Sequence, residues 1–133
     1  MEAWNCARFS KFIDMKKDLD SPEDVALLVD NFYKKVVLNE VLKPFFEGLE
    51  WETHLPKMKK FWRFLLFDEP GYTTNVTEKH LQLPLTKEAF DEWLALFFLT
   101  LDEHFVGSKV LLAKERANII AVGIKSKMNL LEN

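Results

Sequence analysis

Apolar residues recur at helical spacing in four separate segments of this chain, and no segment shows a sustained alternation of polar and apolar residues. In the first segment, Ser21 is a typical helix cap, Pro22 suits the first helical position, and two acidic residues follow. One face of this helix would bury Val25, Leu28, Val29, Phe32, Tyr33 and Val36. The pattern predicts an amphipathic helix from Ser21, then a short helical piece at 41–46 that Pro44 interrupts.

Three further segments carry the same helical period. The first of these stripes consists of His54, Met58, Phe61, Trp62 and Leu65. Thr53 is its expected cap, and Pro56 would fall in the first turn, where proline is tolerated. Thr86 is expected to cap the next helix, and Gly107 and Ser108 begin the last one. Their stripes are Phe90, Trp93, Leu94, Phe97 and Leu101, and then Val110, Leu111, Ala117, Ile120, Ala121 and Ile124.

Composition supports the all-α class. Four Gly and five Pro in 133 residues are few for the many turns of an all-β fold. A chain of this length fits one domain with a hydrophobic core. We therefore predict an all-α domain at 21–133, preceded by an N-terminal extension or short helix at 1–20.

The net charge, the apolar stretches and the cysteine count limit the classes of binding partner and the cellular compartment that the sequence suits. A formal net charge of −3 removes the phosphate attraction on which nucleic-acid binding depends. The longest strongly apolar stretch, 94–101, is too short to span a bilayer, and the first residues lack a secretory core. Cys6 has no second cysteine to pair with. The sequence predicts a cytoplasmic protein without nucleic-acid or membrane partners.

The three histidines occupy different settings. His104 is expected near the end of a helix, where an imidazolium meets the negative end of the dipole, and this favours a structural role. His54 lies on an apolar helix face, where a boundary residue and a ligand or gating residue are both consistent with the pattern. His80 lies in the irregular stretch 68–85, which fits either an ordinary loop residue or a functional one.

These residues suit few kinds of metal chemistry. A structural zinc site needs four Cys or His ligands at short spacing, and hydrolase and phosphate-loop motifs are not found in the sequence. Haem requires only one axial protein ligand and a flat apolar slot. Twelve Phe and four Trp would supply such a slot, although they would equally fill a helical core.

Six short pieces of the sequence occur in a specific order. They are Asn31-Phe32-Tyr33-Lys34-Lys35-Val36, Leu42-Lys43-Pro44-Phe45-Phe46, Trp51-Glu52-Thr53-His54, Phe61-Trp62, Lys79-His80-Leu81-Gln82-Leu83-Pro84 and Phe90-Asp91-Glu92-Trp93-Leu94. Between Ser21 and about Met128, this series resembles the group III truncated haemoglobins of bacteria. The resemblance implies a truncated globin-like fold, a two-over-two helical sandwich around haem b, which is iron protoporphyrin IX.

The resemblance also implies roles for individual residues. His80 matches the proximal ligand of the haem iron. Tyr33 and Trp93 match hydrogen-bond donors that face the bound ligand, and His54 matches a distal position that often gates access. Phe46 matches the ring against the haem face. The matching distal-helix positions that line the pocket are Met58, Phe61 and Trp62.

Lys57 matches a basic position near a haem propionate, although Lys57, Lys59 and Lys60 would equally form a solvated face. The chain departs from the family at two points. Pro56 disfavours helical geometry at the preceding residue and so predicts a distorted helix start around His54. The connection from Phe46 to Trp51 is short, which would draw the distal helix toward the haem or leave its start loosely ordered.

The expected function is reversible binding of dioxygen, nitric oxide or carbon monoxide at an iron held by His80. Oxygen transport, nitric oxide dioxygenation, peroxide chemistry and sensing stay open, and so does whether the protein is an enzyme. No flavin or nicotinamide motif is found, so turnover would need a separate reductase. The alternative is a haem-free helical interaction or sensory module that retains the globin shape. The oligomeric state is not predicted.

Overall fold

The computed structural model describes residues 16–71 and 83–130, most of which lie in four long helices. The elements are α2 (Pro22–Val36), the 3₁₀ helix η1 (Lys43–Phe46), α3 (Trp51–Phe67), α5 (Lys87–His104) and α6 (Ser108–Lys127). Extended pairing within these ranges is limited to one bridge between Lys17 and Phe105. The predicted all-α class is confirmed. None of the helices in the described ranges is long and apolar enough to cross a bilayer.

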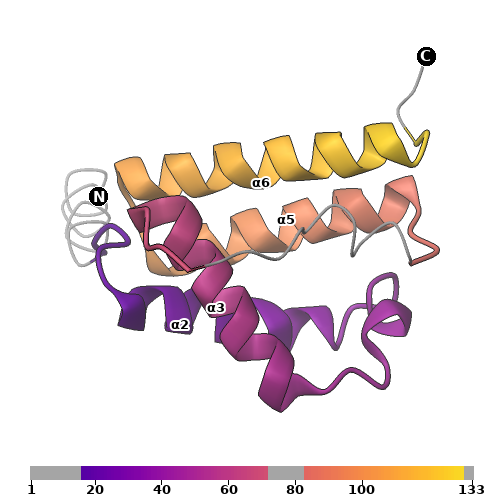
Figure 1. Ribbon diagram of the computed structural model, residues 1–133, viewed down its shortest axis with the longest axis horizontal. Helices are drawn as coiled ribbons and strands as arrows, with labels where there is room; N and C mark the ends of the chain where they lie inside the picture. The colour runs from indigo at the N-terminus through magenta and orange to yellow at the C-terminus, as the bar shows by residue number, and fades with distance from the viewer. Residues whose placement is uncertain (1–15, 72–82, 131–133) are drawn as a thin grey trace, which may run out of the picture.

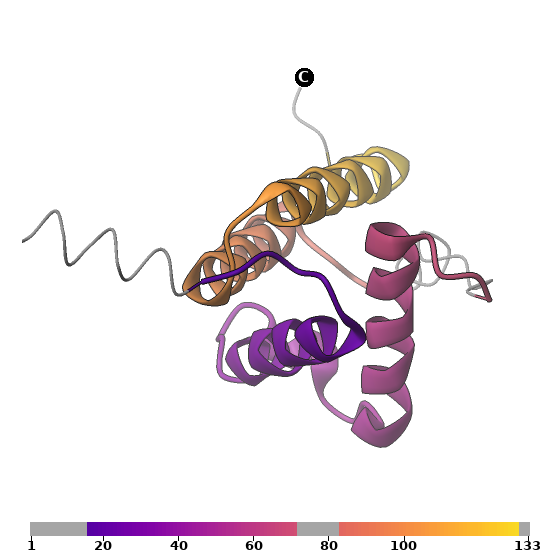
Figure 2. The same cartoon turned by 90° about the vertical axis from the view of Figure 1, so that its left-hand side faces the viewer.

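The helices form the expected two-over-two sandwich. The α2 helix packs against α3 and α5, and α6 packs against α5 and α3. Figure 1 shows α5 and α6 lying side by side above α2. In the turned view of Figure 2, α3 runs across α2 and ends beside α6. The Lys109 ammonium secures this end by donating to the Leu66 carbonyl at 2.6 Å.

Two helix starts follow the predicted caps. The Ser21 hydroxyl accepts a hydrogen bond from the Asp24 backbone N–H at 3.2 Å and opens α2. The Thr86 hydroxyl accepts from the Ala89 N–H at 3.1 Å and opens α5. In both cases a side chain satisfies a backbone donor that the helix itself leaves without a partner.

The start of α3 differs from the prediction. Thr53 is not the cap: α3 begins at Trp51, after Glu50, whose side chain makes no capping hydrogen bond. The N–H groups of Thr53 and His54 already bond to the Glu50 carbonyl, at 3.2 and 3.0 Å. The helix is therefore established before Pro56, which only removes one later donor. The predicted distortion around His54 is wrong, because that residue is helical.

A short turn joins η1 to α3. Gly48 takes a left-handed conformation at φ 77°, which favours glycine and reverses the chain within a few residues. The turn places the Trp51 ring in a stack on Phe46, with centroids 6.0 Å apart and planes at 13°. The short connection thus brings the first residue of α3 against η1.

Phe97 lies at the centre of the core and is fully buried. Its ring stacks on Trp62 and Trp93, with centroid separations of 4.7 and 5.5 Å. Phe32 meets it edge-on at 5.3 Å. Because Phe32 belongs to α2, Trp62 to α3 and Phe97 to α5, one ring joins three helices.

Small residues form the inner face of α6. The buried residues of this helix are Val110, Ala113, Ala117, Ala121 and Ile124. The predicted stripe also includes Leu111, but that side chain is 66% exposed, so this part of the prediction is wrong. Successive helical residues are about 100° apart, and Leu111 therefore faces outward when Val110 points into the core.

Residues 16–20 pack against the turn between α5 and α6. The Asp18 carboxylate accepts from the backbone N–H groups of Lys109 and Val110, at 2.8 and 3.1 Å, and from the Ser108 hydroxyl at 3.3 Å. It thereby caps α6, whose own preceding residue, Gly107, has no side chain to do so. A Cβ atom on Gly107 would collide with Asp18. The division of the chain at residue 21 stays a prediction.

Asp18→Ala is expected to lower the free energy of unfolding by about 1–2 kcal/mol, because three donors at the start of α6 lose their acceptor. Urea denaturation followed by circular dichroism measures the change. Asp91→Ala, at an exposed position of α5, is the control and should change stability by less than about 0.5 kcal/mol. An equal loss in both variants would contradict the capping role.

Candidate functional site

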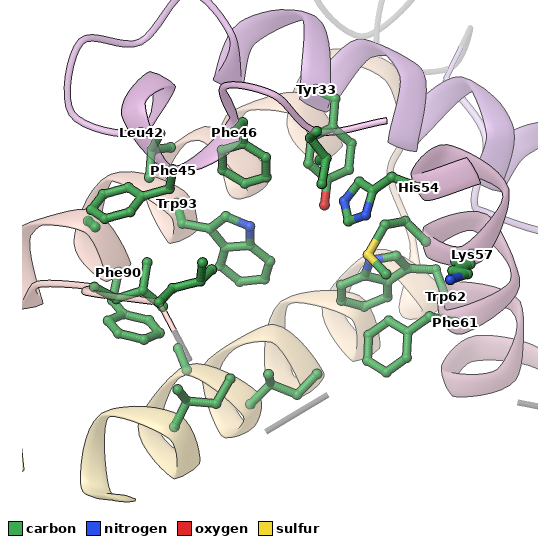
Figure 3. Close-up of a pocket in the computed structure, with 18 of the residues that line it drawn as sticks. Tyr33, Leu42, Phe45, Phe46, His54, Lys57, Phe61, Trp62, Phe90 and Trp93 are labelled. Carbon is green, nitrogen blue, oxygen red and sulfur yellow. The ribbon is translucent and has the colours of Figure 1, made fainter. Parts of the chain in front are cut away.

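A cavity of about 430 Å³ lies between the two helix pairs, a size typical of ligand sites. Figure 3 shows side chains of all the helical elements turned into it. The predicted site residues that line it are Tyr33, Phe46, His54, Lys57, Met58, Phe61, Trp62 and Trp93. His80 lies outside the described residues. The structure therefore brings eight of the nine predicted residues to one cavity, while their individual roles stay predictions.

Two hydrogen-bond donors approach the cavity from different helices. Tyr33 comes from α2 and Trp93 from α5, and Figure 3 shows the phenol hydroxyl and the indole nitrogen directed into the same space. Burial raises the pKa of Tyr33 above its ordinary value. The Tyr33 hydroxyl thus keeps its proton at neutral pH and is able to donate it in a hydrogen bond.

His54 reaches the cavity from α3, and its Nε2 atom is buried. Its ring belongs to a cluster of four aromatic side chains in which every pair is in contact, with centroid separations of 5.4–6.5 Å. The members of this four-ring cluster are Tyr33, Phe46, Trp51 and His54. The cluster holds the His54 ring beside the Tyr33 ring, at 5.5 Å and 77°.

The α3 helix supplies one wall of the cavity and part of its rim. Phe61 and Trp62 are buried, and Met58 is half-buried beside them. Of the three lysines on this helix, Lys57 alone lines the cavity, whereas Lys59 pairs with Asp30 of α2 at 3.0 Å. Lys57 is exposed and so places a cation where the cavity meets solvent.

Sequence reasoning missed several lining residues. Phe45 and Phe90 line the cavity, and α6 contributes Ile120, Ala121 and Ile124. The α6 residues and Phe90 appeared in the predicted stripes, but a stripe does not distinguish a side chain that fills the core from one that borders a cavity. The position of Phe45 next to Phe46 was the sequence feature that could have indicated that Phe45 lines the cavity. His104, in contrast, ends α5 as predicted and lies outside the cavity lining.

The lining fits a flat apolar group with an acidic edge. Phe46, Phe61, Phe90 and Ile120 provide apolar walls, and the exposed Lys57 suits a carboxylate at the rim. Leu83 and Leu85 line the cavity as well, and Leu83 is three positions after His80 in the sequence. These features are compatible with haem, whose propionates are acidic and whose iron requires one axial side chain.

Comparison with solved structures gives the class of this fold. The crystal structure of group III truncated haemoglobin from Campylobacter jejuni matches with a TM-score of 0.79 and 30% identity, over 89% of this chain and 97% of that one. The truncated oxygen-avid haemoglobin from Bacillus subtilis matches with a TM-score of 0.72 and 26% identity, over 78% and 92% of the two chains. The fold is that of a globin.

Sequence similarity gives the family. No family model matches the chain. Group 3 truncated haemoglobin ctb of Campylobacter jejuni is 32% identical over 114 residues, which are 80% of this chain and 90% of that protein. The chain belongs to the group III truncated haemoglobins, a family of haem-binding globins. The resemblance identified in the sequence is confirmed.

Proposed function

We propose that this chain binds dioxygen reversibly at the iron of a haem b held in the cavity by His80. The observation that carries the proposal is the convergence of two donors, Tyr33 and Trp93, from separate helices on one apolar cavity. A polar group in such a place costs free energy unless it has a partner. A small ligand able to accept hydrogen bonds would serve as a partner for both donors.

The donors would set how long the ligand stays. When bound, haem would offer a diatomic ligand an open coordination position where the ligand takes on partial negative charge. Tyr33 and Trp93 would then donate charge-assisted hydrogen bonds to the ligand, each contributing about 1.5–3 kcal/mol. Because 1.4 kcal/mol corresponds to about a factor of ten, each donor would slow ligand release about ten- to a hundredfold.

His80 is the proposed proximal ligand because its imidazole suits iron and its sequence position leads into the cavity wall. Leu83 lines the cavity, and three peptide links span at most about 11 Å. The haem face would rest against Phe46, and Met58, Phe61 and Trp62 would complete the distal wall. The proposed contacts are supported by the fact that all four residues line the same cavity. Lys57 would contact a haem propionate at the rim of this cavity.

Nitric oxide and carbon monoxide would bind at the same position. We propose oxygen binding and transport in the cytoplasm as the basic activity, with nitric oxide dioxygenation or peroxide chemistry requiring a separate reductase. The competing hypothesis is a haem-free sensory or interaction module. Donors on two helix faces would have no purpose there, and an absorption spectrum of the purified protein distinguishes the two hypotheses.

His80→Ala is expected to abolish stable haem binding, because no other side chain is proposed to hold the iron. Haem content and the ferrous absorption spectrum measure the loss. His104→Ala removes the same side chain at the end of α5, outside the cavity lining, and should leave the spectrum unchanged. A His80→Ala protein with wild-type haem content and a five-coordinate ferrous spectrum would refute the assignment.

Tyr33→Phe and Trp93→Phe are each expected to speed dioxygen dissociation about ten- to a hundredfold, since each removes one donor to the ligand. Stopped-flow mixing with a dioxygen scavenger measures the rate. Phe90→Leu alters the cavity lining without removing a donor and serves as the control. Unchanged dissociation in both donor variants would mean that the two rings only pack.

Carbon monoxide association is expected to accelerate on acidification, because histidine is the cavity side chain able to gain a charge in mild acid. A charged imidazole favours solvent over a buried position, so protonation should turn His54 outward and open the cavity. Among the residues that the structure describes, the other titratable side chains that line the cavity are Tyr33, Glu50 and Lys57. Flash photolysis should show the acceleration in the wild type and a flat profile in His54→Leu. Identical profiles would make His54 a bystander.

A further inference from the structure

A second hollow, of about 350 Å³, lies between α2 and α3 on the outer side of the four-ring cluster. Its lining consists of Asp30, Tyr33, Lys34, Val37, Trp51 and Leu55. Tyr33 lines both this hollow and the main cavity, whereas Trp51 lines the hollow but not the main cavity. The two spaces are therefore separated at this point by aromatic side chains.

Trp51 braces this partition from outside. Its ring lies 5.4 Å from Tyr33, 5.7 Å from His54 and 6.0 Å from Phe46, measured between centroids. All three of these neighbours line the main cavity. Displacement of the Trp51 ring would remove one layer of this partition and leave Tyr33, which borders both spaces.

Two features leave the start of α3, where Trp51 lies, with few backbone hydrogen bonds. Trp51 is the first residue of the helix, and Glu50 provides no side-chain cap. Pro56 lacks the N–H that would otherwise bond to the Glu52 carbonyl, so the first turn has fewer internal hydrogen bonds. Helix ends with few hydrogen bonds open at low free-energy cost.

The chemistry of the hollow suits a neutral, apolar solute. Val37, Trp51 and Leu55 supply apolar surface, and the phenyl face of Tyr33 continues it inward. The carboxylate of Asp30 is paired with Lys59 at 3.0 Å, and Lys34 is exposed. The charged groups thus have partners or water, and a diatomic gas would meet mainly carbon.

We propose that Trp51 closes a second access route for neutral diatomic gases, which leads from this hollow past Tyr33 into the cavity. The route is distinct from the passage predicted at His54. This inference rests on the proposed function, because only a bound haem would give the gas a destination in the cavity.

Trp51→Ala is the direct test, measured as carbon monoxide rebinding after flash photolysis. We expect association to accelerate about tenfold, because access through the hollow no longer waits for the ring to move. The same route serves exit, so dioxygen dissociation should rise by about the same factor and the dioxygen affinity should stay within about twofold of the wild type. A larger change in dissociation than in association would assign Trp51 to holding Tyr33 in place and would overturn the route.

A variant that fills the hollow with a larger side chain distinguishes an access route from a general disturbance of the structure by Trp51→Ala. Val37 lines the hollow from the end of α2 but not the cavity, so Val37→Trp should block the hollow without touching the haem site. Added to Trp51→Ala, it should return association to within about twofold of the wild type. Failure to slow association again would overturn the proposal. Trp51→Leu replaces Trp51→Ala if the smaller side chain prevents folding.

Xenon provides a readout that is independent of ligand kinetics. The protein is labelled with 5-fluorotryptophan and studied as its ferrous carbon monoxide complex. The fluorine NMR resonance of Trp51 is identified as the signal that is missing from the spectrum of the Trp51→Phe variant. Xenon pressure should shift this resonance in the wild type and not in Val37→Trp, and the absence of a shift in the wild type would overturn the proposal. If the wild type forms no photolysable carbon monoxide complex, the proposed function is refuted instead. The xenon experiment on the labelled protein as purified then still tests whether the hollow takes up a gas.

Discussion

The stack of rings around Phe97 is the interaction on which the remaining architecture depends. Phe97 contacts Phe32, Trp62 and Trp93 at centroid separations of 4.7–5.5 Å and so fixes the spacing of α2, α3 and α5. Aromatic pairs have preferred geometries in addition to the area they bury. Tyr33 follows Phe32 directly, and Trp93 precedes Phe97 by one helical turn. The same stack that closes the core therefore aims both donors into the cavity.

Local sequence patterns predict what depends on local physics. The four helices and the caps at Ser21 and Thr86 are confirmed because periodicity and capping involve residues a few positions apart. The start of α3 could not be predicted in this way. It is set where Trp51 stacks on Phe46 of the preceding 3₁₀ helix, and this contact is tertiary. Leu111 was misassigned because both of its helical neighbours are also apolar.

The candidate site also contains residues that the sequence predicts and residues that it does not predict. The family resemblance predicted eight of the residues that reach the cavity, including Tyr33 and Trp93, but not Phe90 of α5. It did not predict that Ile120 and Ile124 of α6 complete the lining, since that depends on how closely the alanine face of α6 approaches α5. Nor does local preference decide the geometry of His54. Its ring is positioned by contacts with Tyr33 and Trp51, and its backbone is helical because α3 already begins at Trp51.

The bond between Asp18 and the start of α6 joins residues 91 positions apart. During synthesis on a ribosome, Asp18 emerges long before its partners, so α2, α3 and α5 have to fold while the segment ahead of them is still unattached. Closing so long a loop is entropically costly unless the intervening helices have already brought its ends together. Attachment of this segment should thus be a late event, and chains stalled before α6 would expose the face of α5 against which α6 otherwise packs.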